Sequence, residues 1–234
     1  QTLAGTSLQE HKYISLVHAV AGATTDNINN NTFTNLVANT AGNVTFISRT
    51  GTMASLAGAT DNCNNNSIVG SFSKPVSGGV VTIYTATTPS LTGNTMNQTG
   101  NNFSNITLTG ATTMNGWNNI EGSTSSEGPV KNISNNIFSN WTCGSLAVVC
   151  MFINNAGSNS VVSGNTISNI SATGSSAPTA ITGISFGSSN RGTGISCSGN
   201  ILRGFNNSTT STGAVLGISA NWGSMTVLTL SSNT

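Results

Sequence analysis

The chain has 234 residues, of which only 5% are charged, and its formal net charge is +1. This composition excludes an electrostatic nucleic-acid binder, which needs a basic face, and a polybasic membrane anchor. No apolar run approaches the roughly 18 residues of a transmembrane helix. The chain opens on Gln1 without an initiator Met or a signal peptide, so we expect a mature or trimmed segment of a longer polypeptide.

A short phrase of Asn followed by an apolar residue recurs along the chain. The Asn residues that open the copies are Asn31, Asn66, Asn101, Asn136, Asn165, Asn200 and Asn233. Their spacings are 35, 35, 35, 29, 35 and 33 residues. A nearly fixed period in this range indicates a repeat architecture, in which each unit buries its apolar face only against its neighbours.

Each repeat contains three segments in which apolar and small polar residues alternate, as in half-buried strands. In the copy that starts at Asn165, the predicted strands are Thr166–Ser171, Ala180–Phe186 and Gly194–Ser198. Further strands are predicted over residues 13–20, 26–28, 79–84, 146–153 and 225–230. No helical stripe of period 3.6 occurs. The sequence therefore predicts an all-β fold: one right-handed parallel β-helix domain over residues 1–234, with about seven coils and a repeat of 29–35 residues.

Stacking the repeats predicts which residues point inward. One inward column holds residues 28, 63, 98, 133, 162, 197 and 230, and Gln98 is its discordant polar member. A second column holds residues 33, 68, 103, 138, 167 and 202. A third holds residues 36, 106, 141, 170 and 205, where the second copy slips by one and offers Phe72. The seven repeat-opening Asn residues should share one corner, so that their amides hydrogen-bond along the solenoid axis.

Three stretches carry a resemblance to a known group of proteins: SGNTISNIS, SNNIFSNWT and CSGNILRGF. They resemble the right-handed parallel β-helix repeats of large secreted and cell-surface bacterial proteins, particularly the Asn/Ser/Thr-rich repeats of Bacteroidota type. The resemblance covers nearly the whole chain and implies the fold much more strongly than the function. Proteins of this architecture include pectin-active lyases and hydrolases, adhesins and phage tailspikes.

The few ionisable residues offer little for catalysis. Asp26 and Asp61 are 35 residues apart, so they should stack on adjacent coils. Two carboxylates so placed could bind a cation, but Asp at a turn usually caps backbone N–H groups. We prefer the capping role because no third acid or Arg joins this column, and we leave open whether the pair binds a cation. Lys131 follows in this column two coils later, with Met96 between, whereas Arg49, Lys74, Arg191 and Arg203 should lie away from it.

The His and Trp residues have structural explanations as well as functional ones. His11 and His18 are seven residues apart, which would place them on opposite faces of a strand and disfavours a shared metal site. Trp141 belongs to an inward column, so we expect it in the core. Trp117 and Trp222 belong to second strands, and a sugar-stacking surface is the alternative to burial for these two.

The four Cys residues contain no zinc-binding pattern. Cys143 and Cys150 flank the connection between the first two strands of the 29-residue copy, and we predict that a disulfide joins them across this tightened loop. Cys63 and Cys197 share an inward column but lie four coils apart, so they should be buried thiols.

These observations favour a structural or adhesive repeat segment of a secreted or surface-exposed bacterial protein. We assign no catalytic, cofactor-binding or metal-binding residue and expect no enzymatic activity. The expected partners are flanking segments of the same chain or end-to-end neighbours, with an extracellular polysaccharide as a further possibility, and neither nucleic acid nor membrane insertion. The alternative is a polysaccharide-binding or polysaccharide-degrading module. A groove with clustered acidic and basic side chains would favour the polysaccharide-degrading enzyme, whereas a smooth face of Ser, Thr and Asn would favour the structural role.

Overall fold

The computed structural model describes residues 2–4, 10–18, 23–51, 58–87, 92–122, 127–144, 146–173, 180–207, 213–221 and 227–234. All regular structure in these ranges is β-strand. They contain no helix long and apolar enough to cross a membrane.

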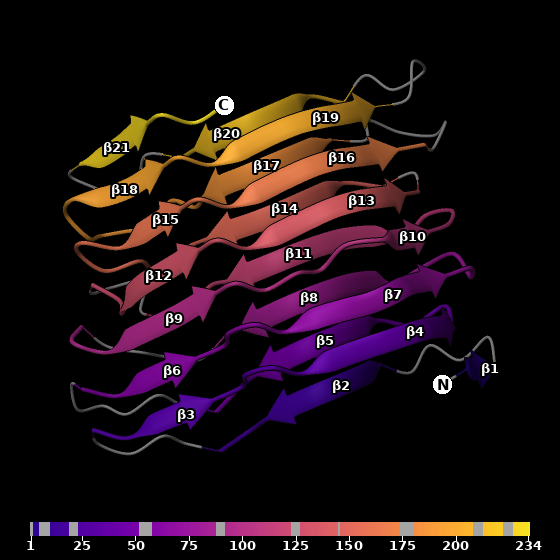
Figure 1. The fold of residues 1–234 in the computed structure, drawn as a ribbon, viewed down its shortest axis with the longest axis horizontal. Coiled ribbons are helices and arrows are strands. Elements are labelled where there is room, and N and C mark those ends of the chain that lie inside the picture. Colours follow the sequence, from indigo (N-terminus) through magenta and orange to yellow (C-terminus); the bar gives the residue numbers. More distant parts are fainter. Residues whose placement is uncertain are drawn as a thin grey trace.

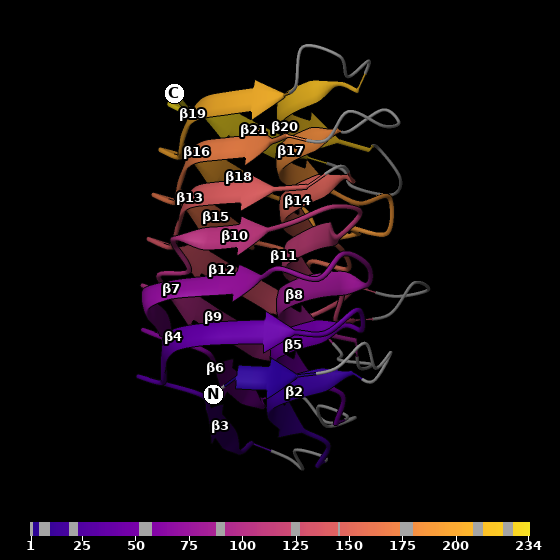
Figure 2. The same ribbon diagram turned by 90° about the vertical axis from the view of Figure 1, so that its right-hand side faces the viewer.

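The strands form three parallel sheets of seven strands each, and the chain visits the sheets in turn (Figures 1 and 2). The first sheet consists of β1 (Thr2–Ala4), β4 (Thr32–Asn39), β7 (Ser67–Lys74), β10 (Ile106–Leu108), β13 (Ile137–Cys143), β16 (Thr166–Ala172) and β19 (Ile201–Asn207). The second consists of β2 (His11–Leu16), β5 (Val44–Arg49), β8 (Val80–Ala86), β11 (Thr113–Asn119), β14 (Val148–Ile153), β17 (Ile181–Phe186) and β20 (Val215–Ala220). The third consists of β3 (Thr25–Asn27), β6 (Thr60–Asn62), β9 (Thr95–Thr99), β12 (Val130–Ser134), β15 (Val161–Ser163), β18 (Ile195–Ser198) and β21 (Leu228–Ser231).

This topology is a parallel β-solenoid, as the repeat predicted. The predicted strands coincide with β16, β17 and β18 to within one residue at each end. Five of the seven strands in each sheet have a neighbour on both sides, so about five turns are enclosed. The expected count of about seven coils therefore includes the two end turns. The 29-residue turn is short chiefly because the connection from β14 to β15 spans only residues 154–160, whereas the corresponding connections from β5 to β6 and from β11 to β12 span residues 50–59 and 120–129.

The repeat-opening Asn residues form a buried hydrogen-bonded ladder along the axis. At Asn101, Nδ2 donates to Oδ1 of Asn136 and to the carbonyl of Cys63, each at 2.8 Å. Its Oδ1 accepts from the backbone N and the Nδ2 of Asn66 at 2.9 and 3.0 Å. The same links join every consecutive pair: Asn31–Asn66, Asn66–Asn101, Asn101–Asn136, Asn136–Asn165, Asn165–Asn200 and Asn200–Asn233. The ladder therefore passes unbroken through the short turn.

Two further amide ladders lie on the outside of the solenoid. In one, Nδ2 of Asn62, Asn97 and Asn132 donates to the Asn side chain of the preceding turn at 2.9–3.0 Å. In the other, Asn140 donates to Asn105 and Asn169 donates to Asn140, each at 3.1 Å. These outer amides point toward the first turn, whereas the amides of the buried ladder point toward the last.

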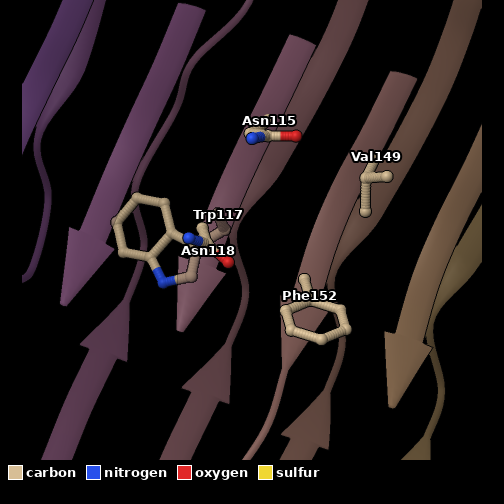
Figure 3. Close-up of a pocket in the computed structure, with 6 residues that line it drawn as sticks. Asn115, Trp117, Asn118, Val149 and Phe152 are labelled. Carbon is tan, nitrogen blue, oxygen red and sulfur yellow. The ribbon is translucent and has the colours of Figure 1, made fainter. Parts of the chain in front are cut away.

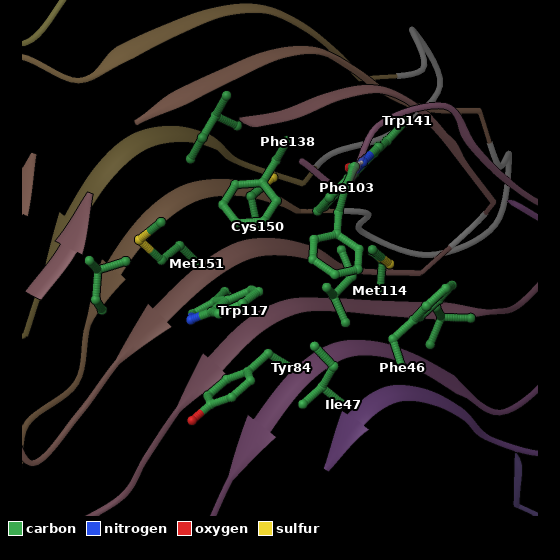
Figure 4. Packing of buried hydrophobic residues seen from close by; sticks show 14 of the residues in the cluster. Phe46, Ile47, Tyr84, Phe103, Met114, Trp117, Phe138, Trp141, Cys150 and Met151 are labelled. Atoms are coloured by element: carbon green, nitrogen blue, oxygen red, sulfur yellow. Dashed lines mark hydrogen bonds between the residues drawn. The ribbon is translucent and has the colours of Figure 1, made fainter. Parts of the chain in front are cut away.

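The apolar columns lie inside the three sheets, as predicted, and aromatic rings crowd the middle turns (Figure 4). The predicted slip at Phe72 is present, since the pairing of β4 with β7 shifts between Thr34 and Leu36. Trp141 is fully buried in its expected column. Leu230 is the exception in the first column, with 50% exposure on the last strand.

The strands of the second sheet bend so that two successive residues point inward. In β11, Gly116 and Trp117 are both buried between the half-buried Asn115 and Asn118. Gly116 lacks a side chain where one would collide, because an added Cβ would lie 2.9 Å from the Trp141 ring and 2.2 Å from the Cys150 carbonyl oxygen. Trp141 of the first sheet thus packs over Gly116 of the second.

The predicted disulfide between Cys143 and Cys150 is wrong. All four cysteines are free thiols and fully buried. Cys143 ends β13 in the first sheet and Cys150 lies within β14 in the second, and both serve as small apolar core residues. Burial raises the pKa of the Cys143 and Cys197 thiols to about 12, and it raises the pKa of Cys63 and Cys150 well above the ordinary thiol value.

Candidate functional site

A group of charged side chains lies inside the solenoid rather than on it. Arg49, the last residue of β5, extends across the core toward the third sheet. Its Nε lies 3.0 Å from Oδ2 of Asp61, its Nη1 donates to Oε1 of Glu121 at 2.8 Å, and its Nη2 lies 3.3 Å from Oδ2 of Asp26. The side chains of Arg49, Asp61 and Glu121 are 0–1% exposed. We call Asp26, Arg49, Asp61, Glu121 and Lys131 the ionic cluster.

The repeat explains how these residues meet. Along the second sheet, Arg49 pairs with Ala86, and Ala86 pairs with Asn119. The small Ala86 leaves room for the guanidinium to run along the axis and reach Glu121, two turns further on. Arg49 therefore contacts Asp26 and Asp61 although, as predicted, it does not share their column. The column argument did not reveal these contacts because Arg49 comes from the second sheet and the two Asp residues come from the third.

Lys131 is held by oxygen atoms within the same interior. Its Nζ donates to Oδ1 of Asn119 and to the carbonyl of Asn154 at 2.6 Å, and to the carbonyl of Glu121 at 2.8 Å. Burial lowers the pKa of this ammonium to about 7, against the opposing effect of the Glu121 carboxylate. The hydrogen bonds position Lys131 as a structural cation.

Burial is also the main influence on the pKa of Asp61. It raises this pKa to about 7, the Glu121 carboxylate adds to the rise, and Arg49 opposes it. Neither Asp61 oxygen receives a directed hydrogen bond in the described part of the chain, so the contact with Arg49 is an ion pair of poor directionality. Burial alone would lower the pKa of Arg49, but the two carboxylates outweigh it and raise that pKa.

The ionic cluster replaces the expected turn-capping role of Asp26 and Asp61. Both carboxylates are ion-paired to Arg49, and Asp26 also lies 2.9 Å from Nε2 of His18. His11 opens β2 and is not part of this contact. Among the residues that the structure describes, no group of three or more His, Cys, Asp or Glu side chains is placed to hold a metal ion.

The remaining predicted candidates are structural or exposed. Lys74 donates to the carbonyls of Val76 and Gly78 at 2.7 and 2.5 Å. Arg203 lies on the exposed face of β19, and Arg191 is half-buried between β17 and β18.

Neither described Trp forms a sugar-stacking surface. Trp117 and Trp141 are both fully buried, and Trp222 lies outside the described residues. The Trp117 ring stacks on Tyr84 with centroids 4.5 Å apart, and its Nε1 donates to Oε1 of Gln98 at 2.7 Å. Gln98 also accepts from Nδ2 of Asn119 at 2.7 Å, which explains the polar residue in an apolar column.

A shallow pocket lies on the outer face of the second sheet, between β11 and β14 (Figure 3). It has a volume of about 140 Å³ and is lined by Asn115, Gly116, Trp117, Asn118, Val149 and Phe152. Asn115 pairs with Val149 and Asn118 pairs with Phe152 across the two strands. Because the two residues between each pair point inward, the outer face is open between these two rows.

Sequence reasoning missed this pocket. The outward column that contains Phe152 otherwise holds Ser15, Ser48, Thr85, Asn118, Ser185 and Ser219. One aromatic residue among hydroxyl and amide side chains was the available signal. It was hidden because the two inward residues interrupt the simple alternation by which a strand is recognised.

Comparison with family models, curated proteins and solved structures found no match to this chain.

Proposed function

We propose that this chain is a structural or adhesive repeat segment of a secreted or surface-exposed bacterial protein, without catalysis of its own. The proposal includes a right-handed β-helix of Bacteroidota type within a longer polypeptide. One observation carries the absence of catalysis: Arg49, Asp61, Glu121 and Lys131 are sealed in the core with 0–1% exposure. An acid/base pair must reach a substrate, and the side chains of these four residues are closed off from solvent.

The outer surface supports a passive role. The described strands present Ser, Thr and Asn outward, and the amide ladders fix these side chains in rows. Such side chains offer hydrogen bonds to a partner but transfer protons poorly near neutral pH. We propose flanking segments of the same chain or end-to-end neighbours as its main partners, in an extracellular setting.

The test is incubation of the purified chain with acidic and neutral polysaccharides, with and without Ca²⁺. We expect no release of reducing ends or unsaturated products. Product release that disappears in Asp61→Asn would refute the proposal and assign the ionic cluster to catalysis. Asn97→Ala, on an outer ladder, is the matched control because it leaves the cluster intact.

The second candidate function is a polysaccharide-binding module. The pocket between β11 and β14 favours it, because its amide and aromatic side chains meet on an uncharged outer face.

A further inference from the structure

We propose that the pocket between β11 and β14 binds one ring of a neutral carbohydrate chain. This inference deepens the second candidate function and rests on the proposed absence of catalysis, since the bound chain must stay intact. We base it on the shape of the pocket, its donors and acceptors, its lack of charge and the outward ring of Phe152.

The pocket is open because the side chains of Asn118 and Phe152 lean apart. Nδ2 of Asn118 lies 3.4 Å from Oγ1 of Thr85, which belongs to the preceding turn. The tip of the Phe152 ring approaches the following turn, where a Cβ added to Gly187 would lie only 2.8 Å from it. Glycine at position 187 thus leaves space for the ring, and the floor between Asn118 and Phe152 stays uncovered.

The polar lining is available to a ligand. Asn115 is half-buried, and its side chain makes no hydrogen bond to any other described residue. Its amide can therefore donate and accept at the same time, as a vicinal pair of hydroxyl groups requires. Asn118 keeps its amide oxygen for the same use, since its contact with Thr85 engages only Nδ2.

The apolar lining suits the carbon-bound face of a sugar ring. Val149 and Phe152 lie at the two ends of the opening on β14, each paired with one of the two amides of β11 (Figure 3). An aromatic ring beside hydrogen-bonding groups matches a ligand with one apolar face and a polar rim. The volume of about 140 Å³ is below the roughly 300 Å³ at which pockets for drug-sized ligands begin. The pocket therefore accommodates one ring of a chain that lies across the sheet.

The absence of charge selects neutral carbohydrates. None of the six lining residues is ionisable. Glu121 and Lys131, which follow β11 in the chain, are turned into the core, so they neither attract nor repel a chain on the outer face. Binding should therefore depend little on ionic strength.

The repeat supplies substitutions that remove the pocket and keep the fold. Phe152→Ser introduces the residue found at the next position of the same column, Ser185, and also at Ser48 three turns before. Asn115→Thr introduces the residue of Thr82 and Thr182 in the other column. Leu216→Thr is the matched control, since it removes an exposed apolar side chain from the same face two turns away.

The experiment is affinity electrophoresis of the 234-residue chain in gels that contain a mixed-linkage β-glucan, a galactomannan, an arabinoxylan or, as an acidic probe, polygalacturonate. We expect retardation by at least one neutral polymer, unchanged between 50 and 500 mM salt. Phe152→Ser should weaken binding about tenfold and Asn115→Thr about threefold. Leu216→Thr should bind like the parent chain.

Retardation by no neutral polymer, or equal retardation of the parent and Phe152→Ser, would overturn the proposal. So would retardation by polygalacturonate alone. A thermal melt of each variant identifies one that failed to fold, and Asn115→Thr then decides in place of Phe152→Ser. The same samples are also assayed for cleavage products, which tests the absence of catalysis separately from binding in the pocket. Cleavage would refute the absence of catalysis, whereas the effect of Phe152→Ser on retardation would still test the pocket.

Discussion

At the scale of single residues, the buried ladder makes each repeat-opening Asn a donor and an acceptor at once. Asn101→Ala would leave the backbone N–H and the amide of Asn66 without their acceptor, and the Cys63 carbonyl without its donor. Each unsatisfied buried group costs about 1–3 kcal/mol, so we expect a loss of about 3 kcal/mol in the free energy of unfolding. Denaturant titration measures it. Asn97→Ala, which removes a rung of an outer ladder, should cost less than about 1 kcal/mol, and equal losses would contradict the role of the buried ladder.

Asp61 predicts a pH dependence of stability. Its pKa in the folded protein is raised to about 7 from the ordinary value of 3.8, so folding favours the protonated acid. The stabilising contribution is complete below about pH 4 and is lost as the pH rises toward 7, by about 2 kcal/mol between pH 5 and 7. The free energy of unfolding should therefore fall over this interval.

Asp61→Asn should flatten this dependence, because Asn keeps the shape and has no proton to lose. Lys131 works in the opposite direction: its lowered pKa adds stability only as the pH rises from about 7 toward 10. Thermal melts at half-unit steps of pH measure both effects. A variant that retains the parental slope between pH 5 and 7 would show that another group titrates there.

At the scale of elements, the bend in the second sheet depends on a small residue where a large side chain of the first sheet packs against it, as Trp141 does against Gly116. Gly116→Ala would place a Cβ 2.2 Å from the Cys150 carbonyl oxygen and 2.9 Å from the Trp141 ring. We expect a loss of about 1–3 kcal/mol in the free energy of unfolding, as for other overpacked cores. Gly217→Ala is the control, because the equivalent position in β20 has nothing within 4 Å. It should be neutral or slightly stabilising, and equal effects of the two changes in a denaturant titration would argue against the packing explanation.

The same elements show what a repeat does and does not reveal. Period and alternation placed the strands, the Asn corner and even the slip at Phe72, because each depends on residues one turn apart in one sheet. The contacts of Arg49 with Asp26 and Asp61 depend on two sheets facing each other across the core, and its contact with Glu121 depends on a side chain that spans two turns. The pocket depends on the doubled inward positions at Gly116 and Trp117. None of these leaves a periodic signal, and the positions of Cys143 and Cys150 on successive strands do not show whether their sulfur atoms meet.

At the scale of the whole molecule, the last described turn exposes apolar side chains along its open strand edges. Val215, Val227 and Leu230 are 44–51% exposed on or beside β20 and β21. Unpaired edges of this kind attract further strands. We expect this 234-residue chain to self-associate with rising concentration, and sedimentation velocity measures it.

Leu230→Lys should suppress this association, because a charge on an edge strand opposes pairing. Val69→Lys is the control, because it introduces the same charge at an exposed strand position of the first sheet, away from that edge. Equal association of the parent and Leu230→Lys would rule out the last turn as the contact.

The three amide ladders have an electrical consequence for a molecule of this shape. Every side-chain amide carries a dipole, and within one ladder the dipoles align head to tail and polarise one another. The buried ladder points its N–H groups toward the last turn, and the outer ladders point theirs toward the first. Their fields therefore oppose one another, so turns can be added along the axis without accumulating opposite partial charges at the two ends.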